Sequence, residues 1–331
     1  MIWLTWRQFR SQALAALIAV GVIAIYLVVL GLQVRSAYDS GVAGCQSHGT
    51  CGSATADFTS RYDLQLTLLN DLLIAAPGVI GIFWGAPLVT RELEAGTHRL
   101  VWNQSVTRGR WLAVKLLVIG LLSIAVTGLL TLLLTWSVSP IDQISADRFS
   151  PTLFATRNIT PLGYAAFAFV LGTCVGIFIR RTVPAMAVTL VVFAGVQVLM
   201  PTVVRENLVS PSHSVVAVNE QVMTHVNGIN TSDNVHLWGY KVPGGWVTDT
   251  SAFLDSSGQP VPVSQLKGCL DSAVNPHALG ACLEKKNLHV NATFQPASHY
   301  WTLQWTETLL FLVLTGVLAA LSFWRVRLRL I

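Results

Sequence analysis

The histidines, cysteines and carboxylates of this sequence are not spaced as a catalytic or metal site requires. No G-x-x-x-x-G-K followed by Ser or Thr is present to cradle ATP phosphates, no H-E-x-x-H to bind zinc, and no G-x-S-x-G to present a nucleophilic serine. Seven of the eight histidines are scattered through polar segments without paired spacing. We therefore predict no catalytic residue, no metal site and no cofactor bound by this chain, so it is not expected to be an enzyme.

One charged segment stands out between long apolar runs, at residues 91–115. It carries five basic residues, and the acids Glu92 and Glu94 lie near its start. A short helix is expected through His98–Asn103, before the turn that leads to Arg108. Composition alone favours a simpler interpretation, a short basic loop beside a membrane with Trp111 as an interfacial aromatic residue.

The elements that hold this segment are predicted to be transmembrane helices. The 331 residues are 53% hydrophobic and 11% charged, whereas soluble domains average about 25% charged residues. A helix needs about 20 apolar residues to cross the hydrocarbon, and in lipid every backbone polar group must be satisfied internally. Six runs meet this requirement: Ser11–Val34, Leu72–Thr90, Leu116–Ile141, Ile159–Ile179, Thr182–Val204 and Thr308–Trp324. The alternative interpretation is a secretory signal peptide, but the first run is longer than the roughly 7–15 residues of a signal peptide's hydrophobic region.

Lysine and arginine positions predict the orientation, because short basic loops stay in the cytoplasm. Twelve of the 21 basic residues, but only the acids Glu92 and Glu94, fall in the short segments 1–10, 91–115, 180–181 and 325–331. We therefore expect both termini in the cytoplasm of a multi-pass plasma-membrane protein. The segments expected on the other side are 35–71 and 142–158, both as external loops, and 205–307, which contains an external domain. No Lys/Arg-rich run suggests nucleic-acid binding.

The predicted fold is an all-α polytopic membrane protein with a small α+β extracytoplasmic domain between the fifth and sixth helices. Residues 1–12 form an amphipathic helix at the membrane interface, with Trp3, Trp6, Arg7 and Arg10 as its interfacial residues, or simply anchor the first span. The predicted parts are residues 1–12, spans one to five in 13–204, the extracytoplasmic domain 205–301, and span six with a tail in 302–331.

Within residues 205–301, strands are expected at Ser214–Val218 and Leu288–Phe294, and helices at Val263–Ser272 and Ala278–Lys286. Four of the five cysteines fall in external segments, where disulfides persist. We predict the bridges Cys45–Cys51 and Cys269–Cys282. Cys174, inside the fourth span, is expected to be a small buried apolar residue.

Only neutral polar groups interrupt most of the spans, although Asp71 and Glu307 approach their external ends. We expect both to lie in the interface or cap helices, the alternative being the lining of a polar exit. The small residues of Gly172-Thr-Cys-Val-Gly176 allow another helix to approach closely.

Two motifs then give a resemblance to a family. The second span ends in R-E-x-E-x-G-T, and S-x-x-R-x-x-W-L-x-x-K follows at Ser105–Lys115. With the amphipathic start and the six-span layout, the chain resembles the permease subunits of type-2 ATP-binding-cassette (ABC) transporters, and Phe294–Glu307 resembles actinobacterial members.

The resemblance implies a dimeric permease, with a second copy or a related permease, driven by two cytoplasmic ABC ATPases that carry the ATP and Mg²⁺. Residues 91–115 would be the coupling segment that docks in the ATPase, and residues 1–12 the connecting helix. The docking residues implied are Arg91, Glu92, Glu94, Gly96, Thr97, His98, Arg99 and Arg108.

The function expected is export of a hydrophobic or amphiphilic substrate through a largely apolar pathway. Phe83, Trp84, Gln197 and Met200 are its candidate lining residues. The alternative is a membrane-anchored receptor or sensor, without transport, whose ligand binds to residues 205–301.

The orientation can be tested with single cysteines at two sites, Arg99→Cys and Lys241→Cys. A membrane-impermeant maleimide should label the Lys241→Cys variant in intact cells, and the Arg99→Cys variant only after permeabilisation, because the two positions are expected on opposite sides of the bilayer. The reverse labelling pattern would overturn the predicted topology.

Overall fold

The structure is a computed structural model that describes residues 2–43, 51–96, 107–145, 148–224, 226–231, 234–242, 244–272 and 275–329. The chain forms two compact units. The first comprises Met1–Ser145, Pro151–Val204 and Gln304–Ile331, and the second comprises Ala146–Ser150 and Arg205–Leu303.

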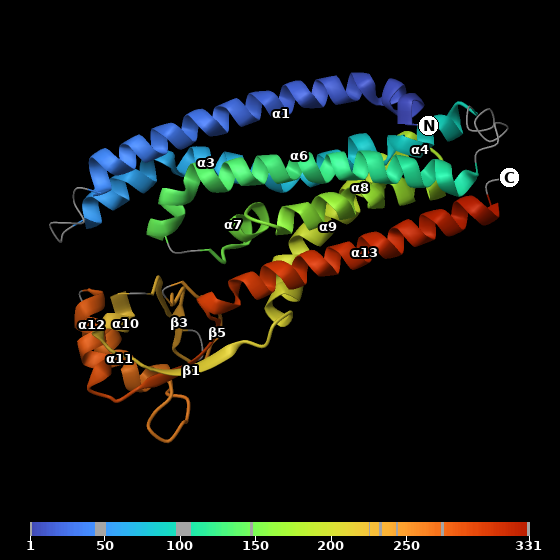
Figure 1. Ribbon diagram of the computed structural model, residues 1–331. Coiled ribbons are helices and arrows are strands. Elements are labelled where there is room, and N and C mark those ends of the chain that lie inside the picture. The colour runs from blue at the N-terminus through green and yellow to red at the C-terminus, as the bar shows by residue number, and fades with distance from the viewer. Residues whose placement is uncertain are drawn as a thin grey trace. The chain divides into compact units, whose positions relative to one another are not determined.

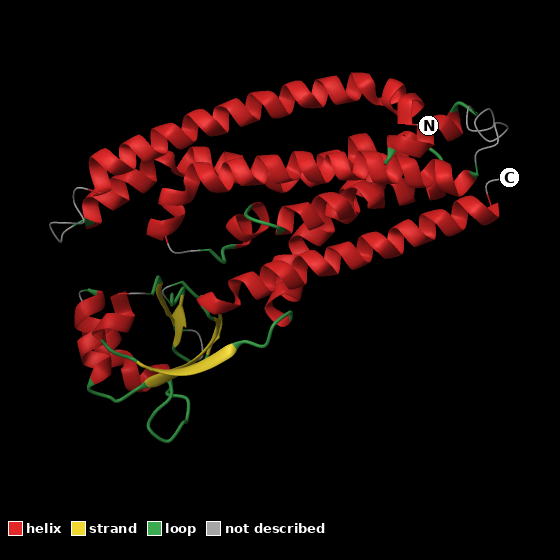
Figure 2. Cartoon of the chain, in the orientation of Figure 1, coloured by secondary structure: helices red, strands yellow, loops and turns green. Residues whose placement is uncertain are grey.

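The first unit is helical (Figures 1 and 2). Its elements are α1 (Ile2–Tyr38), η1 (Asp39–Ala43), α3 (Gly52–Ile80), η2 (Gly81–Gly85), α4 (Pro87–Glu94), α6 (Arg108–Ser145), α7 (Pro151–Thr156), α8 (Thr160–Ile179), α9 (Thr182–Leu199), η3 (Met200–Val204) and α13, which begins at Tyr300 and ends at Arg329. Six stretches are long and apolar enough to cross a membrane: Leu14–Ala43, Gly52–Glu94, Arg108–Ile144, Thr160–Ile179, Thr182–Asn207 and Ala297–Arg327. The six predicted spans are thus confirmed as helices.

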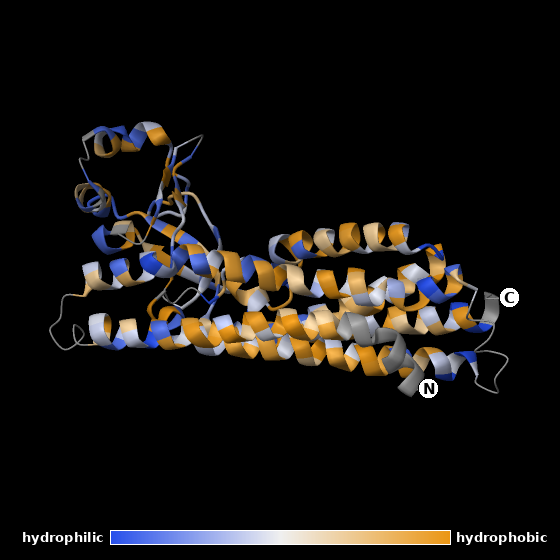
Figure 3. Ribbon diagram, turned by 90° about the horizontal axis from the view of Figure 1, so that it is seen from above, coloured by the Kyte–Doolittle hydropathy of each residue, from blue (hydrophilic) through white to orange (hydrophobic). Residues whose placement is uncertain are grey.

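Several helices continue well past the apolar runs, so the prediction of an external loop over residues 35–71 is wrong. Helix α1 continues to Tyr38, and α3 already begins at Gly52. Phe58 and Tyr62 are buried one turn apart on α3, and the Phe58 ring packs edge-on against Tyr38 at 6.0 Å. The charged residues of this stretch lie on the exposed side of the helix, which is why a search for uncharged runs missed it. In Figure 3 the hydrophobic colouring of the helices gives way to hydrophilic residues toward their ends.

The loop predicted over residues 142–158 is also mostly helical where the structure describes it. Helix α6 continues to Ser145, and α7 occupies Pro151–Thr156. At the start of the chain, α1 is one continuous helix from Ile2. The predicted connecting helix 1–12 is therefore joined to the first span without a break. The side chains of Trp3, Trp6, Arg7 and Arg10 lie outside the description, so their interfacial role stays a prediction.

Helix α8 is the central helix of this unit. In its most apolar window 78% of residues are buried, against 17–22% for the spans of α1, α9 and α13. Glycines permit this burial: a Cβ on Gly172 would come within 2.8 Å of the Ala86 nitrogen, and one on Gly176 within 2.8 Å of the Ala86 oxygen. The close approach predicted from the G-x-x-x-G is confirmed, and its partner is the η2 segment.

The second unit combines strands and short helices (Figure 2). Its elements are η4 (Arg205–Asn207), β1 (Ser212–Ala217), α10 (Glu220–Thr224), β2 (Gly228–Asn230), β3 (His236–Trp238), β4 (Trp246–Thr250), α11 (Val263–Ser272), α12 (Pro276–Glu284), β5 (His289–Gln295) and η5 (Ala297–His299). One antiparallel sheet has the order β1-β5-β4, with Val216 opposite Val290, and β2 pairs with β3. Phe253, Leu266 and Leu283 are fully buried in its core.

Four of the five cysteines lie in the described residues. Cys269 and Cys282 form a disulfide that joins α11 to α12, as predicted, with their Cα atoms 5.7 Å apart. Cys174 is a free, buried thiol in α8, also as predicted. Cys45 lies outside the described residues, so the Cys45–Cys51 bridge stays a prediction.

The backbone contact between α8 and η2 predicts a position-specific effect of side-chain size. Gly172→Leu should destabilise the protein by about 1–3 kcal/mol, because its side chain would meet the η2 backbone and overpack the contact. Gly195→Leu is the matched control: nothing lies within 4 Å of a Cβ there, so the change should stay within about 0.5 kcal/mol. Unfolding of the purified variants in detergent measures both, and equal melting temperatures would contradict the central role of this contact.

Candidate functional site

The predicted coupling segment is described at both of its ends, over residues 91–96 and 107–115. Helix α4 carries Arg91, Glu92 and Glu94, and Gly96 follows with a φ of +68°, a turn conformation that suits glycine. Helix α6 then begins at Arg108. The end of α4, the start of α6 and the end of α13 lie at the same end of this unit (Figure 1). Thr97, His98 and Arg99 lie outside the described residues, and so does the expected helix through His98–Asn103.

A buried ion pair joins the two ends of this segment. Lys115 Nζ lies 2.7 Å from Glu92 Oε1, with 5% and 10% of the two side chains exposed. The same ammonium donates to the Leu88 carbonyl at 3.3 Å and lies 4.6 Å from the centre of the Trp111 ring. The pair thus connects the R-E-x-E motif at the end of α4 with the W-L-x-x-K motif at the start of α6.

Apolar packing surrounds the pair. Trp111 and Leu112 are buried together with Val89, Ile177 and Val326, which brings α4, α6, α8 and α13 into one cluster. A charge pair taken out of water is tolerated only with such close geometry and further hydrogen bonds. The arrangement therefore makes residues 88–92 and 111–115 a single packed joint.

Glu94 makes a second joint, to the start of α9. Its Oε1 accepts from the Thr182 backbone N–H at 2.8 Å, and its Oε2 accepts from the Thr182 hydroxyl at 2.7 Å. The Thr182 and Thr90 hydroxyl groups are 2.9 Å apart. Because the first N–H groups of a helix have no partner within it, this carboxylate satisfies an orphan donor of α9. Just before α9, Arg180 ends α8 with a φ of +59°, so only two residues separate the helices.

These contacts show how two predicted coupling residues are held within the permease. Glu92 is buried against Lys115. Glu94 is exposed, yet both of its oxygens already bind Thr182. The sequence held a signal for the first contact: Lys115 enters an apolar helix, and Glu92 and Glu94 are the only acids among the segments predicted to be cytoplasmic. A buried lysine needs a counter-ion.

Arginines border a cleft beside the joint. A cavity of about 610 Å³ is lined by residues 107–110 of the start of α6, together with Ala113, Phe323 and Arg327. Arg91 and Arg110 are both exposed. This end of the helical unit therefore offers exposed cations beside a packed joint, a surface suited to an acidic partner.

The predicted pathway residues do not come together. Phe83 and Trp84 line an apolar groove with α1 and α6, whereas Gln197 donates to the Ile74 carbonyl at 3.3 Å between α9 and α3. Met200 is buried at the start of η3. Phe83 and Trp84 thus share one groove, which Gln197 and Met200 do not line.

A buried polar cluster, which the sequence did not reveal, occupies the opposite ends of these helices. Arg157, which lies between α7 and α8, binds Asp142 of α6 at 3.1 Å and Asn70 of α3 at 2.9 Å. The Gln304 side chain accepts from the Thr160 hydroxyl at 2.6 Å. No local sequence pattern predicts these contacts, because the partners are far apart in the sequence and meet only when the helices pack.

Glu307 belongs to the same buried polar cluster. Its predicted place in the interface is therefore wrong. It is fully buried, and its Oε1 accepts from the Tyr164 hydroxyl at 2.6 Å. Asp71, the other acid at a span end, is exposed as expected. The buried carboxylate joins α13 to α8, because a polar group within apolar packing needs a hydrogen-bond partner.

Comparison with known proteins gives the class of this helical unit. Residues 17–205 match the family described as ABC-2 membrane transporter related. The match covers more than half of the chain, including most of the first five spans and the residue pairs of both joints. The chain belongs to this family and is an ABC-2 type permease, a membrane component of an ABC transporter. Neither the curated proteins nor the solved structures include a match.

The ion pair predicts a mutational pattern that a surface contact would not give. Lys115→Met or Glu92→Met alone should cost about 3 kcal/mol or more, since each leaves one buried charge without its partner. The double variant should recover most of this loss, because a buried pair can often be replaced by apolar groups without cost. Arg91→Met, at the exposed neighbour of Glu92, is the control. Denaturation in mixed micelles measures all four, and additive losses in the double variant would refute the pairing.

Proposed function

We propose that this permease forms the dimeric translocation pathway of an ABC exporter and is driven by two cytoplasmic ABC ATPases. Membership of the ABC-2 family supports the transport role over that of a receptor or sensor. The observation that carries the mechanism is the Lys115–Glu92 joint, which ties both ends of the coupling segment to the membrane helices. ATP and Mg²⁺ would bind to the partner ATPase, and this chain would supply no catalytic group.

The two joints give a route by which motion of the ATPases would reach the membrane helices. ATP binding would close the ATPases and displace the docked segment between α4 and α6. Glu92 and Lys115 would move α4 and α6 together, and Glu94 would carry the start of α9 with them through Thr182. ATP can drive a change of state only through such differential interactions between states.

The docking surface itself is proposed to be basic. We assign it to Arg91 and Arg110, which are exposed, with Arg108 beside them and with Gly96, Thr97, His98 and Arg99 in the connecting segment between α4 and α6. Glu92 and Glu94 have the different role of bracing the ends of this segment from within the permease. An acidic surface on the ATPase would complement these arginines.

A dimer is supported by the exposed apolar faces of α9 and α13. Leu190 and Val191 on α9, and Leu312 and Val313 on α13, are 46–71% exposed. Such faces need lipid or another apolar surface. In the proposed assembly they face bilayer lipid and a second permease copy or a related permease.

The proposed substrate is hydrophobic or amphiphilic, and export is the proposed direction. The largely buried ionisable groups of the spans include the Lys115–Glu92 pair, Asp142, which pairs with Arg157 in the segment between α7 and α8, and Glu307. Between them the described lining is mostly apolar, which suits an apolar cargo better than an ion. Both termini and the coupling segment would face the cytoplasm, in the plasma membrane, with residues 205–301 outside.

The docking surface predicts a charge-reversal effect confined to one end of the protein. Arg91→Glu with Arg110→Glu should lower the amount of co-purifying ABC ATPase about tenfold or more, because like charges at an interface cost several kcal/mol. Arg148→Glu is the matched control, since Arg148 is exposed in the second unit. Quantitative mass spectrometry of the tagged permease, purified from membranes, measures the ratio. An undiminished ratio in the double variant, at wild-type permease yield, would overturn the docking assignment.

A further inference from the structure

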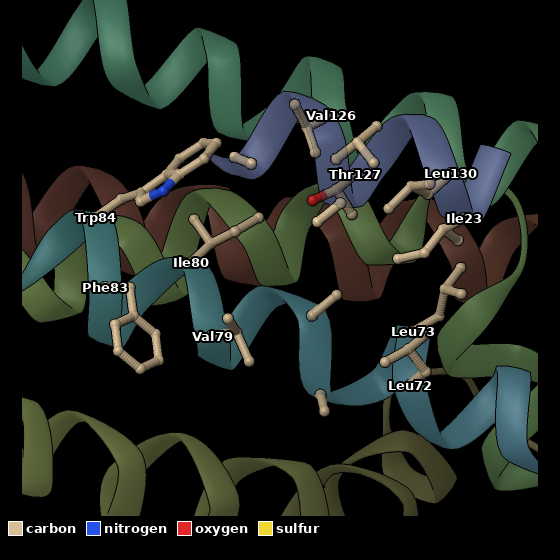
Figure 4. A pocket seen from close by; sticks show the side chains of 15 residues that line it. Ile23, Leu72, Leu73, Val79, Ile80, Phe83, Trp84, Val126, Thr127 and Leu130 are labelled. Carbon is tan, nitrogen blue, oxygen red and sulfur yellow. The ribbon is translucent and has the colours of Figure 1, made fainter. Parts of the chain in front are cut away.

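An apolar groove runs between α1, α3 with η2, and α6 (Figure 4). Its volume is about 220 Å³. Trp84, Leu130 and Leu73 form buried parts of its wall, whereas Val79 and Phe83 are 50% and 54% exposed. The groove thus has a closed inner wall and an outer side that remains accessible, as a binding site for an apolar molecule requires.

One polar side chain interrupts this lining. Thr127 is 3% exposed, and among the residues that the structure describes its Oγ1 has no hydrogen-bond partner. Figure 4 shows the Thr127 oxygen among the apolar side chains of the groove. A buried hydroxyl left without a partner costs about 1–3 kcal/mol, so this position calls for an acceptor.

Other hydroxyl groups of the same helix are satisfied within the protein. Ser123 donates to the Ile119 carbonyl and Thr135 to the Thr131 carbonyl, each four residues back and at 2.8 Å. Thr131 itself donates to the Thr156 carbonyl at 2.8 Å. A threonine in a helix can donate to the carbonyl four residues back in this way. The Thr127 hydroxyl does not do so, and it is directed at the groove instead.

The position of Thr127 within the membrane-spanning stretch limits which acceptor groups can reach its hydroxyl. Thr127 lies near the middle of the membrane-spanning stretch Arg108–Ile144. Water and lipid headgroups do not reach the hydrocarbon centre, where lipid tails offer no acceptor. A plain hydrocarbon chain would fill the groove and leave the hydroxyl unsatisfied.

We propose that the groove is a binding site for a hydrophobic substrate that carries an isolated oxygen acceptor, such as a keto group, in the middle of a hydrocarbon body. The inference rests on the proposed transport function and names the substrate class for one of its predicted linings, that of Phe83 and Trp84. Thr127 donates to the oxygen, and the apolar walls hold the hydrocarbon on either side of it.

The test compares two probes that differ only in that oxygen. Stearate carrying a mid-chain keto group and unsubstituted stearate compete for photolabelling by a diazirine-bearing stearate, on the purified full-length permease in nanodiscs without ATPase. The keto probe should bind about fivefold more tightly, the value of one neutral hydrogen bond of about 1 kcal/mol. Labelled peptides should map to α1, α3 and α6.

Two pairs of variants isolate the groove. Thr127→Val keeps the shape but removes the donor, so the two probes should bind equally while the melting temperature is retained or raised. Thr189→Val, whose hydroxyl is satisfied by the Ala185 carbonyl, should keep the fivefold preference. Ala76→Phe should fill the groove and remove labelling there, whereas Ala194→Phe, on the exposed side of α9, should not.

The outcomes separate this inference from the function on which it rests. Equal binding of the two probes to the wild type, or a preference retained by Thr127→Val, would overturn the groove assignment even if an ABC ATPase co-purifies. If the keto preference holds and depends on Thr127, the groove assignment stands, and failure of any ATPase to associate would count against the proposed transporter alone.

Discussion

A charge pair buried between two helices organises the end of this permease where its coupling segment lies. Lys115 would be costly inside an apolar helix, and Glu92 would be costly at the buried face of α4, but the 2.7 Å contact makes each acceptable. The pair fixes α4 against α6, and Trp111 and Val326 then close the apolar cluster around it. Glu94 extends the same joint to α9 through Thr182. The charges that first suggest a docking surface are thus divided: the acids brace the joint, and the arginines face outward.

The centre of the helical unit depends on a close contact between backbones, which is possible because the two glycines involved have no side chains. Gly172 and Gly176 let α8 meet the backbone of η2, the π-helical stretch between α3 and α4. Such π-helical turns are often found at functional positions. This one begins beside the exposed groove that holds Phe83 and Trp84 and is followed directly by α4. A displacement of α4 would therefore pass straight into the groove wall, which gives the proposed coupling a short physical path.

Polar contacts at the other end keep the helices in register. Arg157 joins α3 and α6, Gln304 joins α13 to α8, and Glu307 binds Tyr164. Each group would be costly alone in an apolar environment and is satisfied by a partner from another helix. Thr127 is the contrasting case, since its hydroxyl is directed at a groove instead of a neighbouring helix. A polar group that binds another helix stabilises the fold, whereas a polar group directed at a groove is available to bind a ligand.

The sequence alone determined the six spans, the strand-containing segment after residue 205, the Cys269–Cys282 bridge and the family resemblance. Each follows from local composition or spacing: an apolar run must be a helix in lipid, and two cysteines close in sequence can meet. Helix length beyond the apolar runs was missed, because Tyr62 and Phe58 pack on a neighbour while charged residues line their other side. Only the tertiary structure decided that Glu92 pairs with Lys115, that Glu307 is buried and that Thr127 faces a groove. The physical reason is that the sequence shows which charges and hydroxyl groups in apolar helices need a partner. Which residue becomes that partner depends on which helices pack together.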